Sequence, residues 1–493
     1  SFLSFASDAN ILCLPNGTRN FYWAFADDLT LAATSAQQAQ RMIDVCVAVL
    51  KDIDSAVNVS KCEVMLVGND AIRKDAAQND HDITINNEII PRVTTMRILG
   101  MLFGHNDPRH LEQAASALQR CQRAYYALLR EGHIHSGVAA RVTKDLVHSC
   151  CIQPLEFGCS VWGRQVYPIL PAALKDKYGL QALKFTSADV AMSTLAAAVL
   201  QIHRNTARAA LLGMVGWRYW TARVLQHKLS LLSSVVTAAP NTTLFGCWEA
   251  RTVLPNERGH SFFADLMHLL ELIHKEHWLD DGLYAHWLYL QTTRFMEPKL
   301  AIKSLCIAYG YERWREEFAD KSSLQRSYAL LNNNNMHCEV LDEMNPYFRM
   351  IRAALWCNVL PELADFNRRK ERPHVCWEDR LCIVCSANVP DTPMHAIMEC
   401  SSVASEREYV KQRIINENLD VVGWLPQVND ESEWAKLRWF NLILHGEIDW
   451  PGPRVTRIVN WRGFRRRAAV CGNKLLKQLV RVRGDRNFVP RRR

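Results

Sequence analysis

The stretch that decides the fold is Phe25-Ala26-Asp27-Asp28-Leu29-Thr30-Leu31, in which two adjacent acidic residues separate two apolar segments. The segments Phe21 to Ala24 and Leu29 to Ala33 predict two strands, joined by a tight turn that carries Asp27 and Asp28. Paired carboxylates bind hard divalent cations such as Mg²⁺, and two such ions can promote nucleotidyl transfer. An Asp-Asp dipeptide alone is a weak signal, because most such pairs are solvated turn residues.

The residues around this turn predict a mixed α/β region. Ser35, followed three residues later by Gln38, is a capping-box start for a helix that continues to Leu50. Two further strands are expected at Cys62 to Val67 and at Met96 to Phe103.

Beyond His110 the hydrophobic pattern becomes helical. Apolar residues recur three or four positions apart at Leu111, Ala114, Ala115, Leu118, Cys121 and Tyr125. The middle of the chain is therefore expected to be a series of helices, and the fold class α+β.

Charge is distributed unevenly along the 493 residues. The formal net charge is +8, but residues 454 to 493 contain 14 Lys or Arg and a single acid, Asp485, which gives +13. The other 453 residues carry −5. The pattern indicates a basic tail on a slightly acidic body and favours an anionic partner, nucleic acid above a membrane surface.

Composition sets the broad class. The chain is 48% hydrophobic and 22% charged, which is typical of a globular protein with several domains. It has no run of 18 apolar residues, so no membrane insertion is expected. The 16 scattered cysteines indicate reduced thiols in an intracellular compartment, nucleus or mitochondrion. Because the chain begins with Ser1, we expect a processed N-terminus, with a removed transit peptide left open, or a segment of a longer protein.

A second candidate site lies near the C-terminus. Cys382, Cys385, His395 and Cys400 are separated by two, nine and four residues. Two thiolates on one tight turn and a His-Cys pair on the next element predict a closed tetrahedral site for a structural Zn²⁺ ion. His374 and Cys376 are near enough to compete as ligands, and a chance match remains the alternative.

The basic tail combines cations with aromatic residues. Arginine gives bidentate phosphate contacts, and aromatic rings stack on unpaired bases. The predicted nucleic-acid contacts are Trp461, Arg462, Phe464, Arg465, Arg466 and Arg467, then Lys474, Lys477, Arg481 and Arg483 at spacings that suit one face of a helix. A solvated face or a nuclear-localisation signal are the alternatives. Arg120 and Arg123 are further candidates, or simply exposed helix residues.

The order of these segments resembles a known family. Phe25 to Leu31, then Val57-Asn58-Val59-Ser60-Lys61-Cys62-Glu63, then Ile98-Leu99-Gly100-Met101, resembles the palm of reverse transcriptases of non-LTR, LINE-type retrotransposons, including the ingi-like ones. Pro154 to Trp162 resembles a segment of the LINE thumb, and Asp391 to Cys400 resembles the CCHC zinc finger downstream of it.

The resemblance implies a domain order. It predicts a truncated palm over residues 1–105 and a helical thumb over 106–235. A helical extension over 236–345 and a zinc-finger region over 346–410 follow, and 411–493 form a C-terminal region with the basic tail.

The resemblance also implies roles for single residues. Asp27 and Asp28 correspond to two of the three carboxylates that bind catalytic Mg²⁺, while the third lies on a strand upstream in the family. Nothing in the spacing of Asp8 makes it a substitute. Arg120 and Arg123 fall in the thumb, which tracks the template-primer duplex, so RNA or an RNA-DNA hybrid is the expected partner.

Two classes of function follow. The first is a reverse-transcriptase-derived RNA-binding protein that does not polymerise alone, for example a structural subunit bound to other proteins in a ribonucleoprotein such as a mitochondrial ribosome. The second is a segment of an active RNA-directed DNA polymerase.

Overall fold

The computed structural model describes a chain that is mostly helical, with small antiparallel sheets, and is α+β in broad terms. The described residues are 22–67, 82–105, 110–134, 138–163, 170–180, 187–202, 206–236, 238–242, 306–307, 309–310, 313–317, 346–356, 381–382, 384–385, 387–417, 425–445 and 461–483. Much of the predicted helical extension, together with Asp8, His374 and Cys376, lies outside them.

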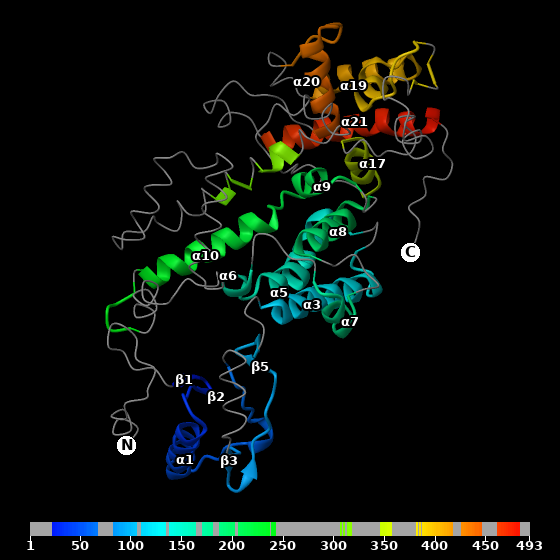
Figure 1. Ribbon diagram of the computed structural model, residues 1–493. Coiled ribbons are helices and arrows are strands. Elements are labelled where there is room, and N and C mark those ends of the chain that lie inside the picture. The colour runs from blue at the N-terminus through cyan, green and yellow to red at the C-terminus, as the bar shows by residue number, and fades with distance from the viewer. Residues whose placement is uncertain are drawn as a thin grey trace. The chain divides into compact units, whose positions relative to one another are not determined.

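The acidic pair lies on a β-hairpin, as expected. Strand β1 (Tyr22–Phe25) pairs with β2 (Asp28–Leu31) in antiparallel register, with Phe25 opposite Asp28 (Figure 1). The two-residue turn is Ala26-Asp27, and Ala26 has a left-handed φ of 53°. A positive φ at the first turn position suits a hairpin because it matches the twist of the strands. Asp28 therefore starts β2, and Asp27 completes the turn.

Helix α1 (Ala36–Asp52) begins where the capping signal predicts. The Ser35 hydroxyl accepts a hydrogen bond from the Gln38 amide at 3.2 Å. The Gln38 side chain bonds the amide of Thr34 at 2.8 Å, one residue earlier than a capping box requires. The buried side of α1 includes Met42 and Cys46.

The predicted strand Met96 to Phe103 is wrong as a single strand. It is a hairpin of β5 (Thr95–Ile98) and β6 (Met101–Gly104). Leu99 and Gly100 have φ of 47° and 83°, so the chain reverses between them. A two-residue turn with both φ positive is the tight type I′ connection.

The predicted strand Cys62 to Val67 is also wrong. The short η2 turn (Val59–Lys61) precedes it, and its only described pairing is an isolated parallel bridge between Val64 and Arg92.

A hairpin not expected from the sequence completes this region. Strands β3 (Thr84–Ile85) and β4 (Glu88–Ile89) flank Asn86 and Asn87, whose φ values are 52° and 67°. Asparagine tolerates the left-handed conformation, which makes this pair a suitable type I′ turn. The buried residues beside it are Ile83, Ile85 and Ile90, with partly buried Ala39, Ile43, Val47, Val57, Val59, Cys62 and Val64 packed against them.

Two segments that carry the family resemblance lie in contact. The Phe157 ring packs over Gly100, where an added Cβ would lie 3.4 Å from it. Gly158 has a φ of 69° and faces the side chain of Met101, which would lie 2.7 Å from an added Cβ. The Trp162 indole donates a hydrogen bond to the Phe157 carbonyl at 2.8 Å. The Leu-Gly turn and the Phe-Gly segment therefore form one packed unit.

The helices fall into two compact units. One takes its described residues from 1–120, 155–187 and 221–307, and the other from 121–154, 188–220 and 308–493. The helices before residue 240 are α3 (Leu111–Arg130), α4 (Ala140–Val147), the π-helical turn η3 (His148–Ile152), α5 (Gln153–Glu156), α6 (Cys159–Trp162), α7 (Ala172–Lys177), α8 (Ala188–Leu200), α9 (Arg208–Val215) and α10 (Trp220–Val236).

The C-terminal helices pack around a single helix, α21 (Trp461–Arg483). They are α17 (Pro346–Trp356), the π-helical turn η5 (His395–Glu399), η6 (Ser401–Val403), α19 (Ala404–Glu417), α20 (Glu433–His445) and α21 (Trp461–Arg483). Helices α17, α19 and α20 pack against α21 (Figure 1). The crossing of α20 and α21 is close, because a Cβ on Gly472 would lie 2.5 Å from the Ile443 carbonyl oxygen. Helix α21 is thus part of a core.

A buried arginine ties these helices together. Arg352 of α17 is fully buried and donates to the carbonyls of Ile443 and Leu444 at the end of α20. It also donates to the Ala469 carbonyl and to Asn473 on α21. The last carbonyls of a helix have no partners within it, so a cation at this position satisfies and stabilises them.

No helix in the described part of the chain is both long enough and apolar enough to span a lipid bilayer.

Candidate metal centre and nucleic-acid interface

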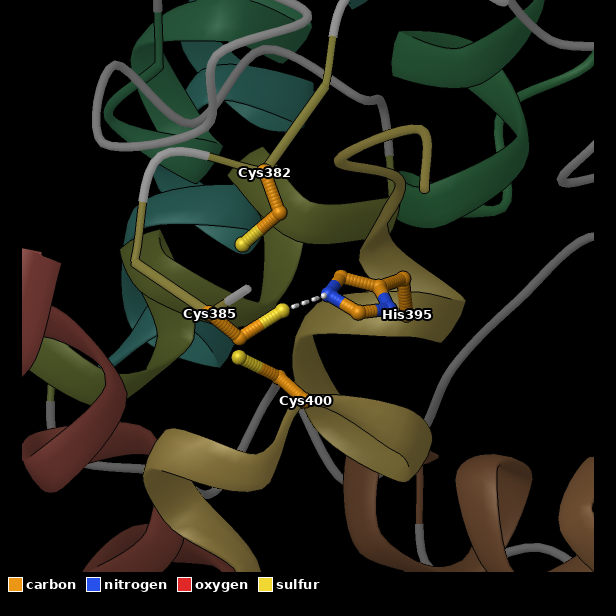
Figure 2. Close-up of side chains that lie close together, drawn as sticks. All are labelled: Cys382, Cys385, His395 and Cys400. Carbon is orange, nitrogen blue, oxygen red and sulfur yellow. Dashed lines mark hydrogen bonds between the residues drawn. The ribbon is translucent and has the colours of Figure 1, made fainter. Parts of the chain in front are cut away.

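The four predicted zinc ligands come together. One ligand atom from each of Cys382, Cys385, His395 and Cys400 lies within 4.8 Å of all the others, and Figure 2 shows the four side chains converging. The Cys385 Sγ lies 3.3 Å from His395 Nε2. Bond lengths of about 2.3 Å to sulfur and about 2.0 Å to nitrogen place the ligands of a tetrahedral Zn²⁺ roughly 3.5 Å apart. The cluster therefore fits a metal ion, and its soft donors suit zinc.

Local backbone structure builds the cluster. Leu381 and Pro390 form an antiparallel bridge, and the Cys382 amide bonds the Val389 carbonyl at 2.9 Å, so the chain between them folds back as a turn. The π-helical turn η5 then carries His395, and the Cys400 amide bonds the His395 carbonyl at 2.7 Å. A π-helical bond joins residues five apart, which brings a His and a Cys separated by four residues to the same side.

Further side chains support the ligands. His395 Nδ1 lies 3.7 Å from the Glu399 carboxylate, and Glu399 lies 3.5 Å from the ammonium of Lys436 on α20. A carboxylate behind a histidine ligand orients the ring and raises its basicity. Burial lowers the pKa of His395, but the neighbouring Glu399 carboxylate and Cys382 thiol outweigh it, and the net pKa is raised.

The surroundings of Cys400 favour its thiolate form. Burial raises its pKa, but the hydrogen bond from Ser402, whose Oγ lies 2.9 Å from Sγ, and the positive charge of Arg483 outweigh burial. The net pKa of Cys400 is lowered. None of the described cysteines forms a disulfide bond.

Arg483 does not lie where the sequence analysis placed it. Its guanidinium forms a 2.8 Å ion pair with Asp391, and the two side chains are 1% and 0% exposed. The predicted contact between Arg483 and nucleic acid is therefore wrong. The physical reason is helical geometry, because two residues turn a helix by about 200° and carry Arg483 to the side opposite Arg481.

The exposed face of α21 is basic. Lys474, Lys477 and Arg481 are exposed and follow one another at spacings of three and four residues, and half-buried Arg467 continues the same face. We call Lys474, Lys477 and Arg481 the basic row. The opposite face is apolar and buried, with Phe464, Ala468, Cys471, Leu475 and Leu479.

The burial of Phe464 corrects another prediction. Its ring is 0% exposed and packs in the core, so it does not stack on bases. Trp461, Arg462, Arg465 and Arg466 begin α21, but their side chains lie outside the described part of the structure.

Sequence reasoning missed an aromatic residue beside the basic row. Tyr409 of α19 is 47% exposed, and the Lys474 ammonium lies 3.6 Å from the centre of its ring. Because Tyr409 lies on a mostly polar helix 65 residues before Lys474, only the packing of α19 against α21 reveals the pair.

Arg120 and Arg123, the two arginines on α3 predicted to contact nucleic acid, differ in exposure. Arg123 is exposed, whereas Arg120 is half-buried, and its Nε and one terminal nitrogen make no hydrogen bond within the described residues. Burial lowers the pKa of Arg120, and the positive charge of Arg97 lowers it further. Within the described part of the chain neither Arg97 nor Arg120 forms an ion pair with a carboxylate, so a bound anion would stabilise these two neighbouring cations. Arg97, on β5, was not singled out from the sequence.

The acidic turn does not make a metal site by itself. Asp27 and Asp28 are exposed, and the only group of three or more His, Cys, Asp or Glu ligands in the described ranges is the Cys/His cluster. Two carboxylates on an open turn offer Mg²⁺ too few protein ligands for a catalytic pair of ions.

Neither the models of known protein families nor the curated protein sequences match this chain. Evidence on its function therefore comes from the sequence motifs and from the sites described above.

Proposed function

We propose that this chain is a nucleic-acid-binding protein derived from a non-LTR retrotransposon reverse transcriptase, with RNA or an RNA-DNA hybrid as its partner. A structural Zn²⁺ ion held by the Cys/His cluster orders the region that displays the basic row. The observation that carries the proposal is the two-sided character of α21, which buries an apolar face and exposes Lys474, Lys477 and Arg481.

The basic row has dimensions that suit a phosphate backbone. The seven steps from Lys474 to Arg481 span about 10 Å of helix at about 1.5 Å per residue. Phosphates on one strand of a duplex are spaced about 3.4 Å along the axis, so the row matches about three of them. Tyr409, held against Lys474, adds an aromatic surface for an unpaired base.

The first compact unit supports the proposed descent. The hairpin turn presents Asp27 and Asp28 together, and the contacts between Gly100 and Phe157 and between Met101 and Gly158 join two segments that carry the resemblance. Arg97 on β5 and Arg120 on α3 add positive charge to this unit. These features favour a partial palm and thumb that bind nucleic acid.

The test compares two charge-matched double variants. Lys477→Gln with Arg481→Gln removes two cations of the basic row, while Lys51→Gln with Arg141→Gln removes one exposed Lys and one exposed Arg elsewhere. Affinity for single-stranded RNA and for an RNA-DNA hybrid is measured by fluorescence anisotropy against salt concentration. The row variant should lower the salt slope by about 1.4, at about 0.7 per lost contact on a single strand, and the control should not. Equal slopes for both variants would refute the interface.

The alternative function is polymerisation, favoured by the presence of both Asp27 and Asp28 on the turn. We propose that the chain alone does not catalyse it, because the described residues supply no third carboxylate at this site. A primer-extension assay on an RNA template decides between the two. Incorporation by the purified chain that Asp27→Ala abolishes would establish the polymerase instead.

A further inference from the structure

We propose that Arg483 belongs to the metal centre, where it supports Cys382 as a ligand and couples metal binding to the docking of α21. The inference rests on the zinc site of the proposed function and goes beyond it. It extends the site from the segment 382–400 to the last residue of a helix that begins at Trp461.

The geometry places one guanidinium between two anionic groups. The two terminal nitrogens of Arg483 lie 3.8 and 3.7 Å from the Cys382 Sγ. One of them also donates to the Asp391 carboxylate at 2.8 Å. The planar fork of arginine can serve two acceptors at once, whereas lysine acts as a point charge.

The charge balance of the metal centre favours a cation at the position of Arg483. A metal-bound cysteine is a thiolate, so Zn²⁺ with three thiolates and a neutral imidazole carries one net negative charge. Asp391 adds a second negative charge in a position that is 0% exposed. A buried charge without a partner is strongly destabilising, and Arg483 supplies the compensating cation.

Metal binding and helix docking then strengthen each other. A metal holds Cys382 as a thiolate, which is a better hydrogen-bond acceptor for Arg483 than a thiol is. By thermodynamic reciprocity, a docked Arg483 raises the affinity for the metal by the same factor. Arg481 and the rest of the basic row lie on the same helix, so zinc occupancy also stabilises the surface proposed to contact nucleic acid.

The experiment measures zinc affinity of the full chain by competition with a chelator. Arg483→Gln should weaken zinc binding about 10- to 100-fold, the range found when an outer residue of a metal site is lost. Arg483→Lys should give an intermediate loss. The matched control is Arg481→Gln, an exposed residue two positions away, which should change affinity less than about twofold. Equal affinities for the Arg481 and Arg483 variants would overturn the inference.

Two further measurements keep the test decisive if Arg483→Gln folds poorly because Asp391 stays buried. The double variant Asp391→Asn with Arg483→Gln removes both charges and should show the same weakened zinc binding. In the native chain, removal of zinc should accelerate amide exchange at residues 475–483 about tenfold or more and leave α8 unchanged. Unchanged exchange at 475–483 would contradict the coupling.

The outcomes separate this inference from the proposal beneath it. A native chain that binds no stoichiometric zinc would refute the metal site itself. A native chain that binds zinc independently of Arg483 would refute only the coupling.

Discussion

The acidic turn and the Cys/His cluster are both groups of potential metal ligands, but they differ in how far the surrounding structure encloses them. Asp27 and Asp28 stand exposed on a two-residue turn, whereas Cys382, His395 and Cys400 are buried. The cluster has four converging ligands and supporting side chains from α20 and α21. A ligand motif becomes a site when other elements enclose it, and that has happened here only at the C-terminal cluster among the described residues.

The sharpest test of this contrast is loss of one ligand from each group. Cys385→Ser should remove most of the bound zinc and destabilise the C-terminal helices, because structural zinc contributes about 10 kcal/mol or more to small zinc-dependent modules. Asp27→Ala should leave zinc content unchanged and alter the unfolding free energy by less than about 0.5 kcal/mol, since its side chain is exposed. Metal analysis and urea unfolding measure both. Similar losses from the two variants would abolish the contrast.

The enclosure of the cluster can be weakened without touching a ligand. Gly472→Ala inserts a Cβ 2.5 Å from the Ile443 carbonyl oxygen and should separate α20 from α21. Overpacking of this kind destabilises by about 1–3 kcal/mol. The control is Val470→Ala on the same helix, where the side chain is 52% exposed and the expected change is within about 0.5 kcal/mol. Thermal unfolding gives the comparison, and a neutral Gly472→Ala would show that the close crossing is not needed.

The carboxylate behind the histidine ligand should have a smaller effect. Glu399→Gln removes the negative charge that faces His395 Nδ1 and should weaken zinc binding about tenfold. Glu408→Gln on α19 is a control of the same chemistry, since Glu408 contacts Arg407 and Lys411 and none of the four ligands. Chelator competition at constant pH measures the difference. If the two variants bind zinc equally, the contact at 3.7 Å does not support the ligand.

The smallest effect is expected at an exposed ion pair on α19. The hydrogen bond from Arg413 lowers the pKa of Glu417, although burial opposes it. A lowered carboxyl pKa adds stability above the unfolded-state pKa of about 4.3, and this stability is lost as pH falls through the folded-state pKa. Glu417→Gln should therefore lower stability slightly between about pH 5 and 7, where the pair contributes, and should match the native chain near pH 3, where the pair is already lost. Stability profiles from pH 3 to 7 check it, and a difference between the variant and the native chain that is as large at pH 3 as at pH 7 would be inconsistent with this pair.

Sequence reasoning succeeded where the signal was local. The Asp-Asp hairpin, the start of α1 at Ser35 and the convergence of the four predicted metal ligands depend on residues close in sequence. The strand expected at Met96 to Phe103 failed because Leu99 adopts a positive φ, which is rare for a branched side chain and is not signalled by residue type.

Long-range contacts were beyond the reach of the sequence pattern. Nothing near Arg483 in the sequence indicates that its partner is Asp391, 92 residues earlier. A run of basic residues instead predicts a solvated surface. Helical periodicity alone could have shown that Arg483 does not share a face with Lys474, Lys477 and Arg481, because it places them on different sides of the helix axis.

The hydrogen bonds of Arg352 have a consequence for how the C-terminus can be altered. A chain that ends before Trp461 lacks the Ala469 and Asn473 acceptors, so Arg352 on α17 keeps fewer hydrogen-bond partners. It also lacks Leu475 and Leu479, so the apolar surface against which these side chains pack becomes exposed. Deletion of the basic segment is therefore a folding experiment and not a binding experiment. Natural substitutions in α21 are restricted in the same way. Changes of charge are tolerated at the outward positions, whereas the inward positions are needed for the packing of α21 against the other C-terminal helices.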